Sequence, residues 1–141
     1  HQIKLQADLE FSEADFSDAD VLFLPGGMPG TRNLAAHEGL CGELLKADKA
    51  GKRLAAICAG PSVFGGLGIL EGRKATCYPG FEGELKGAEY TRQGVVTDGN
   101  VTTARGLGYA LDLGIELLAL LTDREHAGQI KDSIQYDQIP M

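Results

Sequence analysis

Apolar residues in this chain alternate between short continuous runs and longer stretches with helical spacing. Residues 21–24 and 53–57 are the clearest runs, and each is followed by small residues. Such runs are typical of strands buried on both faces of a parallel sheet. Residues 95–97 and 100–104 are β-branched runs separated by Asp98-Gly99, the strongest short signal for a hairpin.

Helical spacing appears between these strands. Leu40, Leu44 and Leu45 lie on one face of a helix predicted over residues 40–50, and Gly51 is a suitable stop. A second helix is expected to follow Cys58 and run to about Gly66. The remaining predicted helices are a short one over 81–86, a long apolar one over 107–121, and a last one that begins after Asp123 as N-cap and extends through Ile130.

Weaker patterns complete the chain. Residues 3–5 alternate like an edge strand, residues 7–19 are acidic and predict a turn with a short helix, and residues 74–76 predict a short strand. Strands that alternate with helices predict an α/β sandwich around a mostly parallel sheet. We expect one domain over residues 1–141, with ligands bound beyond the carboxyl ends of its strands.

Composition narrows the classes of partner. The 141 residues carry a net charge of −7, which argues against nucleic acid and anionic membranes as partners. No signal peptide or membrane-spanning run is recognisable, and three cysteines at unrelated spacings suggest reduced thiols. We therefore expect a cytoplasmic protein. The chain opens on His1 in what resembles the middle of a strand, so we expect an upstream piece, cleaved or separate.

The stretch around Cys58 carries the candidate chemistry. Cys58 lies between an apolar run and Ala59-Gly60-Pro61, which can open a helix. A strand that turns abruptly into a helix holds its turn residue in a tight backbone conformation, with the side chain at the positive end of the helix, as in the elbow of serine hydrolases. The helix dipole and free N–H groups there favour thiolate over thiol. The alternative is that Cys58 packs as a small hydrophobic residue.

A second strand end supports the catalytic interpretation. Gly26 and Gly27 follow the run at 21–24 and allow close backbone approach. Arg105 follows another strand near the expected pocket, where it either binds an anion or pairs with an acidic residue. Residues 106–110 match a dinucleotide fingerprint in spacing, but no parallel strand ending in an acidic residue follows, so we expect no nucleotide cofactor.

Three segments resemble the ThiJ/PfpI family in order and spacing. They are Leu24-Pro25-Gly26-Gly27, residues 55–61 with Cys58 and residues 103–108 with Arg105. The resemblance covers essentially the whole chain. It implies a flavodoxin-like three-layer sandwich, usually a homodimer, with Cys58 as the reactive residue. It also implies that the backbone N–H groups of Gly27 and Ala59 form an oxyanion pocket, which fits the donors that a thiolate adduct requires.

The chain departs from the family pattern at two places. Family members carry a glutamate, hydrogen-bonded to the cysteine, in an N-terminal strand and helix that these residues do not match. Many relatives also have a histidine where this sequence has Tyr78. Tyrosine is a poor base near neutral pH but can donate a hydrogen bond across the pocket. His1, His37 and His126 are expected to be solvated or packing residues.

These features predict a cysteine-dependent protein that acts on reactive aldehydes or glycated proteins, as the family's glyoxalase and deglycase activities imply. No metal or other cofactor is expected. Two alternatives stay open: a non-enzymatic sensor or chaperone in which peroxide oxidises Cys58, and a link to thiazole phosphate or thiamine metabolism. The other thiols, Cys41 and Cys77, are expected to pack, although Cys77 beside Tyr78 could be a secondary oxidation site.

Overall fold

A four-stranded sheet forms the centre of the computed structural model, which describes residues 3–136. Its strands, in spatial order, are β1 (Val21–Leu24), β2 (Arg53–Ile57), β6 (Val101–Ala104) and β5 (Val95–Asp98). The first three run parallel, and β5 is antiparallel to β6 as a hairpin. The parallel sheet and the hairpin predicted from the apolar runs are both confirmed.

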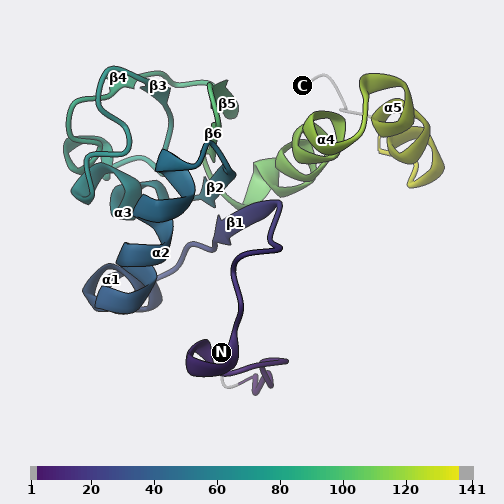
Figure 1. Ribbon diagram of the computed structural model, residues 1–141. Helices are drawn as coiled ribbons and strands as arrows, with labels where there is room; N and C mark the ends of the chain where they lie inside the picture. The colour runs from purple at the N-terminus through teal and green to yellow at the C-terminus, as the bar shows by residue number, and fades with distance from the viewer. Residues whose placement is uncertain (1–2, 137–141) are drawn as a thin grey trace.

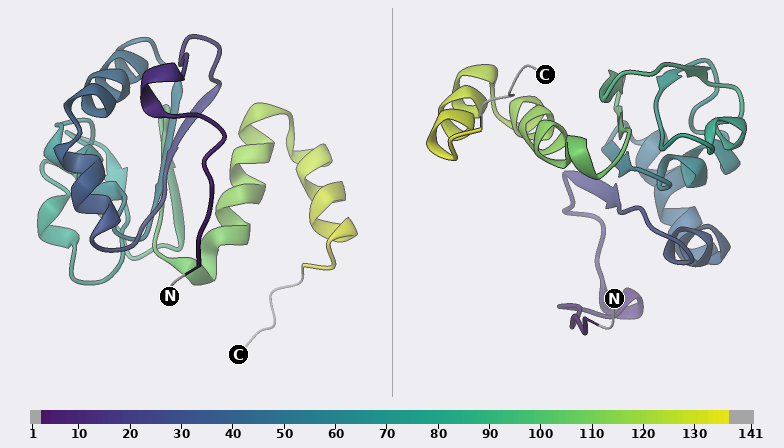
Figure 2. Two further views of the ribbon diagram at one scale, coloured as in Figure 1. Left: turned by 90° about the horizontal axis from the view of Figure 1, so that it is seen from below. Right: turned by 180° about the vertical axis from the view of Figure 1, so that it is seen from behind.

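Helices cover both faces of this sheet, as Figures 1 and 2 show. One face carries α1 (Gly30–Ala36), α2 (Glu38–Lys49) and α3 (Pro61–Gly66). The other carries α4 (Ala110–Leu121), which packs on β6, and α5 (Arg124–Ser133), which packs on α4. The fold is therefore the expected α/β arrangement, a mixed sheet between helical layers.

The main core lies between the sheet and the first helical layer. Leu54, Ala55 and Ala56 of β2 are completely buried, as expected for a strand covered on both faces. Leu44 of α2 and Phe64 of α3 are equally buried and form one cluster with Leu54 and Ala56. Burial of large side chains such as these contributes roughly 1.5–3 kcal/mol each, so this cluster contributes substantially to the stability of the fold.

Short elements fill the connections. A second, two-stranded sheet joins β3 (Lys74–Ala75) to β4 (Glu89–Tyr90), with the 3-10 turn η2 (Glu82–Glu84) between them. Two further 3-10 turns are η1 (Phe11–Glu13) and η3 (Leu107–Tyr109). The predicted strand at 74–76 and the helix at 81–86 are thus each present in a shorter form.

Three predictions of secondary structure need correction. Residues 3–5 form no strand, and their apolar members Ile3 and Leu5 are 78% and 91% exposed, because no neighbouring strand pairs with them among the described residues. The sequence prediction missed α1, whose first residues Gly30-Thr31 follow Pro29 and resemble a turn. The long helix predicted from Leu107 begins instead as η3 and becomes α-helical only at Ala110.

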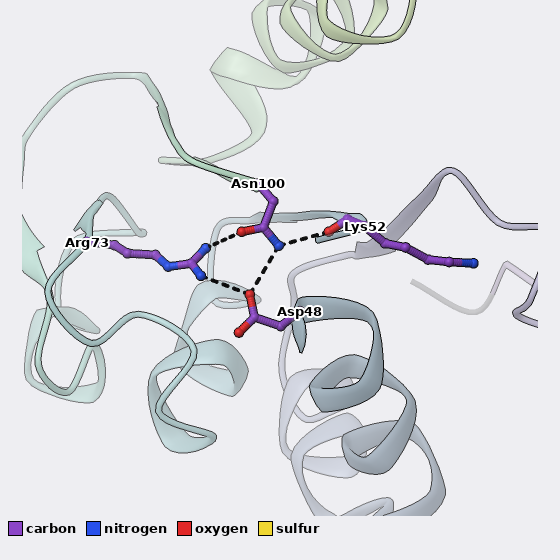
Figure 3. A network of polar contacts seen from close by, with 4 residues as sticks. All are labelled: Asp48, Lys52, Arg73 and Asn100. Atoms are coloured by element: carbon purple, nitrogen blue, oxygen red, sulfur yellow. Dashed lines mark hydrogen bonds and ion pairs between the residues drawn. The ribbon is translucent and has the colours of Figure 1, made fainter. Parts of the chain in front are cut away.

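A polar network closes the amino end of the sheet (Figure 3). Arg73 donates to Asn100 Oδ1 at 2.6 Å and pairs with Asp48 Oδ1 at 3.0 Å. Asn100 Nδ2 donates to the same Asp48 oxygen at 3.1 Å and to the carbonyl of Lys52 at 2.9 Å. This network, hereafter the amino-end network, ties the end of α2 to the start of β2 and to the hairpin turn.

Among the described residues, no helix combines the length and hydropathy needed to span a bilayer.

Candidate functional site

Cys58 occupies a sharp turn between β2 and α3. Its φ is 65°, in the left-handed region where a residue with a Cβ is strained by roughly 1–2 kcal/mol. Hydrogen bonds hold this conformation: the Cys58 N–H donates to the carbonyl of Ala104, and the Cys58 carbonyl accepts from the Tyr78 N–H, both at 2.9 Å. The strained turn is thus fixed to two neighbouring segments, as expected for a nucleophile elbow.

Two glycines allow the end of β1 to approach this turn. A Cβ at Gly26 would lie 2.5 Å from the Cβ of Cys58 and 3.2 Å from its Sγ. A Cβ at Gly60 would lie 3.0 Å from the carbonyl oxygens of Ile57, Leu24 and Pro25 alike. The backbone of the Pro25-Gly26 segment therefore touches the cysteine directly. Gly26 was expected here from the sequence; the role of Gly60 was not.

The Cys58 side chain, partly exposed, opens into a hollow of about 380 Å³. This hollow, hereafter the Cys58 hollow, lies at the carboxyl ends of β1 and β2, where the sequence predicted a ligand site. Nine residues line it: Phe23, Pro25, Gly26, Gly27, Ile57, Cys58, Leu107, Ala110 and Leu113. None of them carries a charge, so the environment of the sulfur is largely apolar.

The walls contributed by β1 and η3 were not predicted from the sequence. Phe23 is 48% exposed and Leu107 is 88% exposed. Both belong to apolar stretches that indicate burial when taken alone. Their exposure beside a reactive residue is a property of the packed molecule and was not predicted from the sequence.

The two predicted oxyanion donors differ in their placement. Gly27 lines the Cys58 hollow with φ at 93°, and its carbonyl accepts from the N–H and the hydroxyl of Thr31. Ala59 follows the cysteine but is 2% exposed. Within residues 3–136, neither the Gly27 N–H nor the Ala59 N–H donates to a protein group. Both donors thus have hydrogen-bonding capacity left for a ligand, and their role in an oxyanion pocket stays a prediction.

Tyr78 and Arg105 lie in a neighbouring hollow of about 330 Å³ rather than in the Cys58 hollow. The two hollows share Leu107 as a wall. Tyr78 is half-exposed, and its connection to the elbow runs through its backbone N–H. Both residues thus lie at the carboxyl end of the sheet, but they line a separate depression, hereafter the Arg105 hollow.

The three thiols differ in environment. Cys77 is completely buried, and burial, with help from Glu82, raises its pKa from an ordinary value of 9.0 to about 11. Cys41, in α2, is partly exposed and points to the carbonyl of Ala35 at 3.4 Å. Cys77 is therefore a neutral packing residue at physiological pH, which makes the suggested secondary oxidation site unfavourable.

No histidine or carboxylate is seen to assist Cys58 within residues 3–136. None of them forms a hydrogen bond to its sulfur there. His37 instead caps α2 by accepting from the Leu40 N–H at 3.0 Å, and its ring contacts Phe11. The described residues also contain no cluster of histidine, cysteine or acidic side chains that could hold a metal ion. The site consists of one thiol, backbone N–H groups and apolar walls.

Comparison with known proteins agrees with this geometry. The DJ-1/PfpI family profile matches residues 1–120. Among curated proteins, DJ-1 homolog B of Arabidopsis thaliana is 38% identical over 92% of this chain and 30% of its own length. A deglycase of Pyrococcus horikoshii is 35% identical over 74% of this chain and 64% of its own.

Solved structures show the same relationship. Drosophila melanogaster DJ-1beta superposes with a TM-score of 0.81 at 28% identity, covering 86% of this chain and 67% of that one. A DJ-1 superfamily protein from Salmonella typhimurium gives 0.80 at 32% identity, covering 84% and 65%. The chain spans about a third of the length of its Arabidopsis relatives and about two thirds of these structures. By the match of its profile, its sequence and its fold, the chain belongs to the DJ-1/PfpI family.

Proposed function

We propose that this protein converts reactive carbonyl compounds through Cys58, as a glyoxalase or deglycase. The observation that carries the proposal is the strained elbow: Cys58 is held at φ 65° with its side chain opening into a hollow at the carboxyl ends of the strands. The Pyrococcus horikoshii relative is named a deglycase, which supports the same chemistry at 35% identity.

The reaction follows from the groups present. The Cys58 sulfur bonds to the aldehyde carbon of an α-oxoaldehyde, and the thiol proton ends on the former carbonyl oxygen, which gives a hemithioacetal. The hydrogen on that carbon then ends on the adjacent carbonyl carbon and the proton of its hydroxyl ends on the adjacent oxygen, which produces the thioester of an α-hydroxy acid. Water then hydrolyses the thioester, releasing the acid and restoring the thiol. The N–H groups of Gly27 and Ala59 are the proposed donors to the oxyanions formed on the way.

Proton transfer in this reaction needs a base, and the described residues place none against Cys58. We propose that a carboxylate from polypeptide outside this sequence, in the same protein or another, supplies it. Two observations indicate that such a segment could pack beside β1. Within residues 3–136, β1 pairs only with β2, and Phe23 on β1 is 48% exposed. An additional strand beside β1 would cover Phe23 and reach the mouth of the Cys58 hollow.

The experiment is a turnover assay with the complete polypeptide that carries these residues. Methylglyoxal is supplied and lactate is measured for the parent, for Cys58→Ala and for Cys41→Ala as the matched control, since Cys41 is the other partly exposed thiol. We expect turnover in the parent and in Cys41→Ala and none above background in Cys58→Ala. Full turnover in Cys58→Ala would refute the proposal. Light scattering on the same samples tests the homodimer that we expect.

One observation favours oxidation as a second candidate. A matching solved structure is that of oxidised Toxoplasma gondii DJ-1, at a TM-score of 0.81 and 29% identity. Here Cys58 is accessible whereas Cys77 is sealed in the core. Peroxide would then oxidise Cys58 to sulfenate and sulfinate, each step consuming one peroxide and releasing water. A parent protein that turns over no carbonyl but gains two oxygen atoms at Cys58 alone would favour this sensor function.

A further inference from the structure

Arg105 leaves the sheet directly beside Cys58. In the parallel register of β2 and β6, Ile57 is the partner of Ala104. The next residues along the two strands are therefore Cys58 and Arg105, and the Cys58 N–H donates to the Ala104 carbonyl at 2.9 Å. The backbone of Arg105 is itself fixed, because its N–H donates to the carbonyl of Gly94 at 2.8 Å. A cationic side chain is thus anchored one strand away from the sulfur.

The guanidinium of Arg105 has no ion pair or hydrogen bond within residues 3–136. Arg73 and Arg124, in contrast, are paired with Asp48 and Glu116. The chain has 20 acidic residues against 13 basic ones, so acidic partners are plentiful. Arg105 is nevertheless half-buried in a hollow that no acidic residue lines. A partly desolvated cation without an anion is an available site for one.

Two tyrosines stand in the same hollow, and glycines set their positions. A Cβ at Gly94 would lie 2.0 Å from the ring of Tyr109, and a Cβ at Gly106 would lie 3.3 Å from the ring of Tyr78. Each ring therefore packs close to backbone. Phenol hydroxyls and a guanidinium are all hydrogen-bond donors to a carboxylate. The Arg105 hollow hence combines one positive charge with two fixed rings that carry further donors.

We propose that the Arg105 hollow is an anion subsite of the Cys58 site and that it selects carbonyl substrates carrying a carboxylate. The substrate class is an α-oxoaldehyde with a carboxylate a few bonds from the reacting carbon. Its aldehyde lies against Cys58 in one hollow and its carboxylate binds Arg105 in the other. The bonds between the two groups pass over Leu107, which lines both hollows. This inference deepens the proposed function and rests on it for the identity of the reaction, although the subsite itself can be tested without turnover.

The direct test compares two alkylating reagents that differ in charge. Iodoacetate and iodoacetamide both form a bond from Cys58 sulfur to carbon and release iodide, and only iodoacetate carries a carboxylate. The complete polypeptide is labelled with each, and the rate at Cys58 is followed by mass spectrometry. The ratio of the iodoacetate rate to the iodoacetamide rate at Cys58 is divided by the same ratio for N-acetylcysteine, which corrects for the intrinsic reactivities of the two reagents. We expect iodoacetate to be favoured, and Arg105→Gln to lower the ratio by about tenfold, the effect of losing a hydrogen bond to a charged group.

Matched variants make the outcome decisive. Arg92→Gln removes an exposed arginine that lines neither hollow, and we expect its ratio to equal that of the parent. Arg105→Lys keeps the charge without the two-pronged geometry, and we expect an intermediate ratio. Salt should slow iodoacetate but not iodoacetamide in the parent, a readout that needs no variant. Equal ratios in the parent and Arg105→Gln, or an equal drop in Arg92→Gln, would overturn the subsite.

A turnover assay separates this inference from the proposed function. Pentanoate with oxo groups at carbons 4 and 5 is compared with its methyl ester, which is neutral and has the same reacting end. Preference for the acid in the parent that disappears in Arg105→Gln supports both ideas. Turnover without preference retains the function and overturns the subsite. Absence of any turnover counts against the function, and the alkylation ratio then decides the subsite alone.

Discussion

The two ends of the central sheet differ in how their polar side chains are paired. At the amino end, Asp48, Arg73 and Asn100 satisfy one another and cap the start of β2 (Figure 3). At the carboxyl end, Cys58 and Arg105 have no such partners within residues 3–136, and hollows replace the network. Polar groups that bind each other stabilise a fold, whereas polar groups left without partners are available to a ligand.

Backbone conformation differs in the same way. The turns at the amino end place glycines at positive φ, at Gly51, Gly72 and Gly99. At the carboxyl end Gly27 also has a positive φ of 93°, but the turn after β2 places a cysteine in this region, at φ 65°. A glycine adopts this conformation without steric cost. A side chain is therefore kept at a strained position that faces the Cys58 hollow, which is where a reactive group would be needed.

The largest expected effect is produced by Gly26→Ala. Its new Cβ would lie 2.5 Å from the Cβ of Cys58 and 2.9 Å from the carbonyl of Ile57, so either β1 or the elbow must move. We expect a loss of about 2–3 kcal/mol in the free energy of unfolding and loss of rapid alkylation at Cys58. Chemical denaturation and thiol labelling measure the two effects. Gly30→Ala is the control, since nothing lies within 4 Å of its new Cβ. A Gly26→Ala protein with the stability and the alkylation rate of the parent would contradict the close approach of Gly26 to Cys58.

Alkaline pH should destabilise the protein through Cys77. Burial raises the pKa of this thiol from 9.0 to about 11, so the folded state retains its proton where the unfolded state releases it. The stability contribution is full below pH 9 and is lost as the pH rises toward 11, at about 1.4 kcal/mol per pH unit. Denaturation curves between these limits measure the slope. Cys77→Ala should remove the contribution of this thiol to the slope. An unchanged slope in that variant would contradict the assignment of the pH dependence to Cys77.

Asp48→Ala should separate stability from reactivity. It removes the acceptor shared by Arg73 and Asn100 in the amino-end network, and we expect a loss of about 2 kcal/mol in the free energy of unfolding. Because this network lies at the opposite end of the sheet, the alkylation rate of Cys58 in the folded protein should not change. A matched loss of reactivity would show that the two ends are coupled.

The smallest effect concerns the strain at the elbow itself. Cys58→Gly and Cys58→Ala both remove the sulfur, but only glycine adopts φ 65° without a Cβ penalty. We expect Cys58→Gly to be more stable than Cys58→Ala by about 1 kcal/mol, measured by thermal or chemical unfolding. Equal stability would show that the turn is not strained.

Part of this architecture could be predicted from the sequence because it depends on local patterns. The apolar runs at 21–24 and 53–57 and the hairpin signal at Asp98-Gly99 each correspond to observed strands. The error at residues 3–5 has a physical cause, since alternation alone forms no strand without a partner. The two-residue strand β4 carries no periodicity, because its strand conformation comes from pairing with β3.

The candidate site could be predicted only in part. Cys58, Gly26 and Gly27 follow from motif and strand ends, and the structure gathers them around one hollow. The apolar walls formed by Phe23 and Leu107 could not be predicted, because their exposure depends on how β1 and η3 pack. The division into two hollows was equally invisible, since it depends on where Leu107 lies between Cys58 and Arg105.

We infer that the fold makes Cys58, and neither Cys41 nor Cys77, chemically available for reaction. The rate of iodoacetamide labelling at each of the three cysteines, resolved by mass spectrometry on the folded, complete polypeptide, tests this inference. We predict that Cys58 reacts at least about tenfold faster than Cys41, and that Cys77 reacts only after unfolding. Labelling of Cys41 or Cys77 as fast as Cys58 would contradict the account.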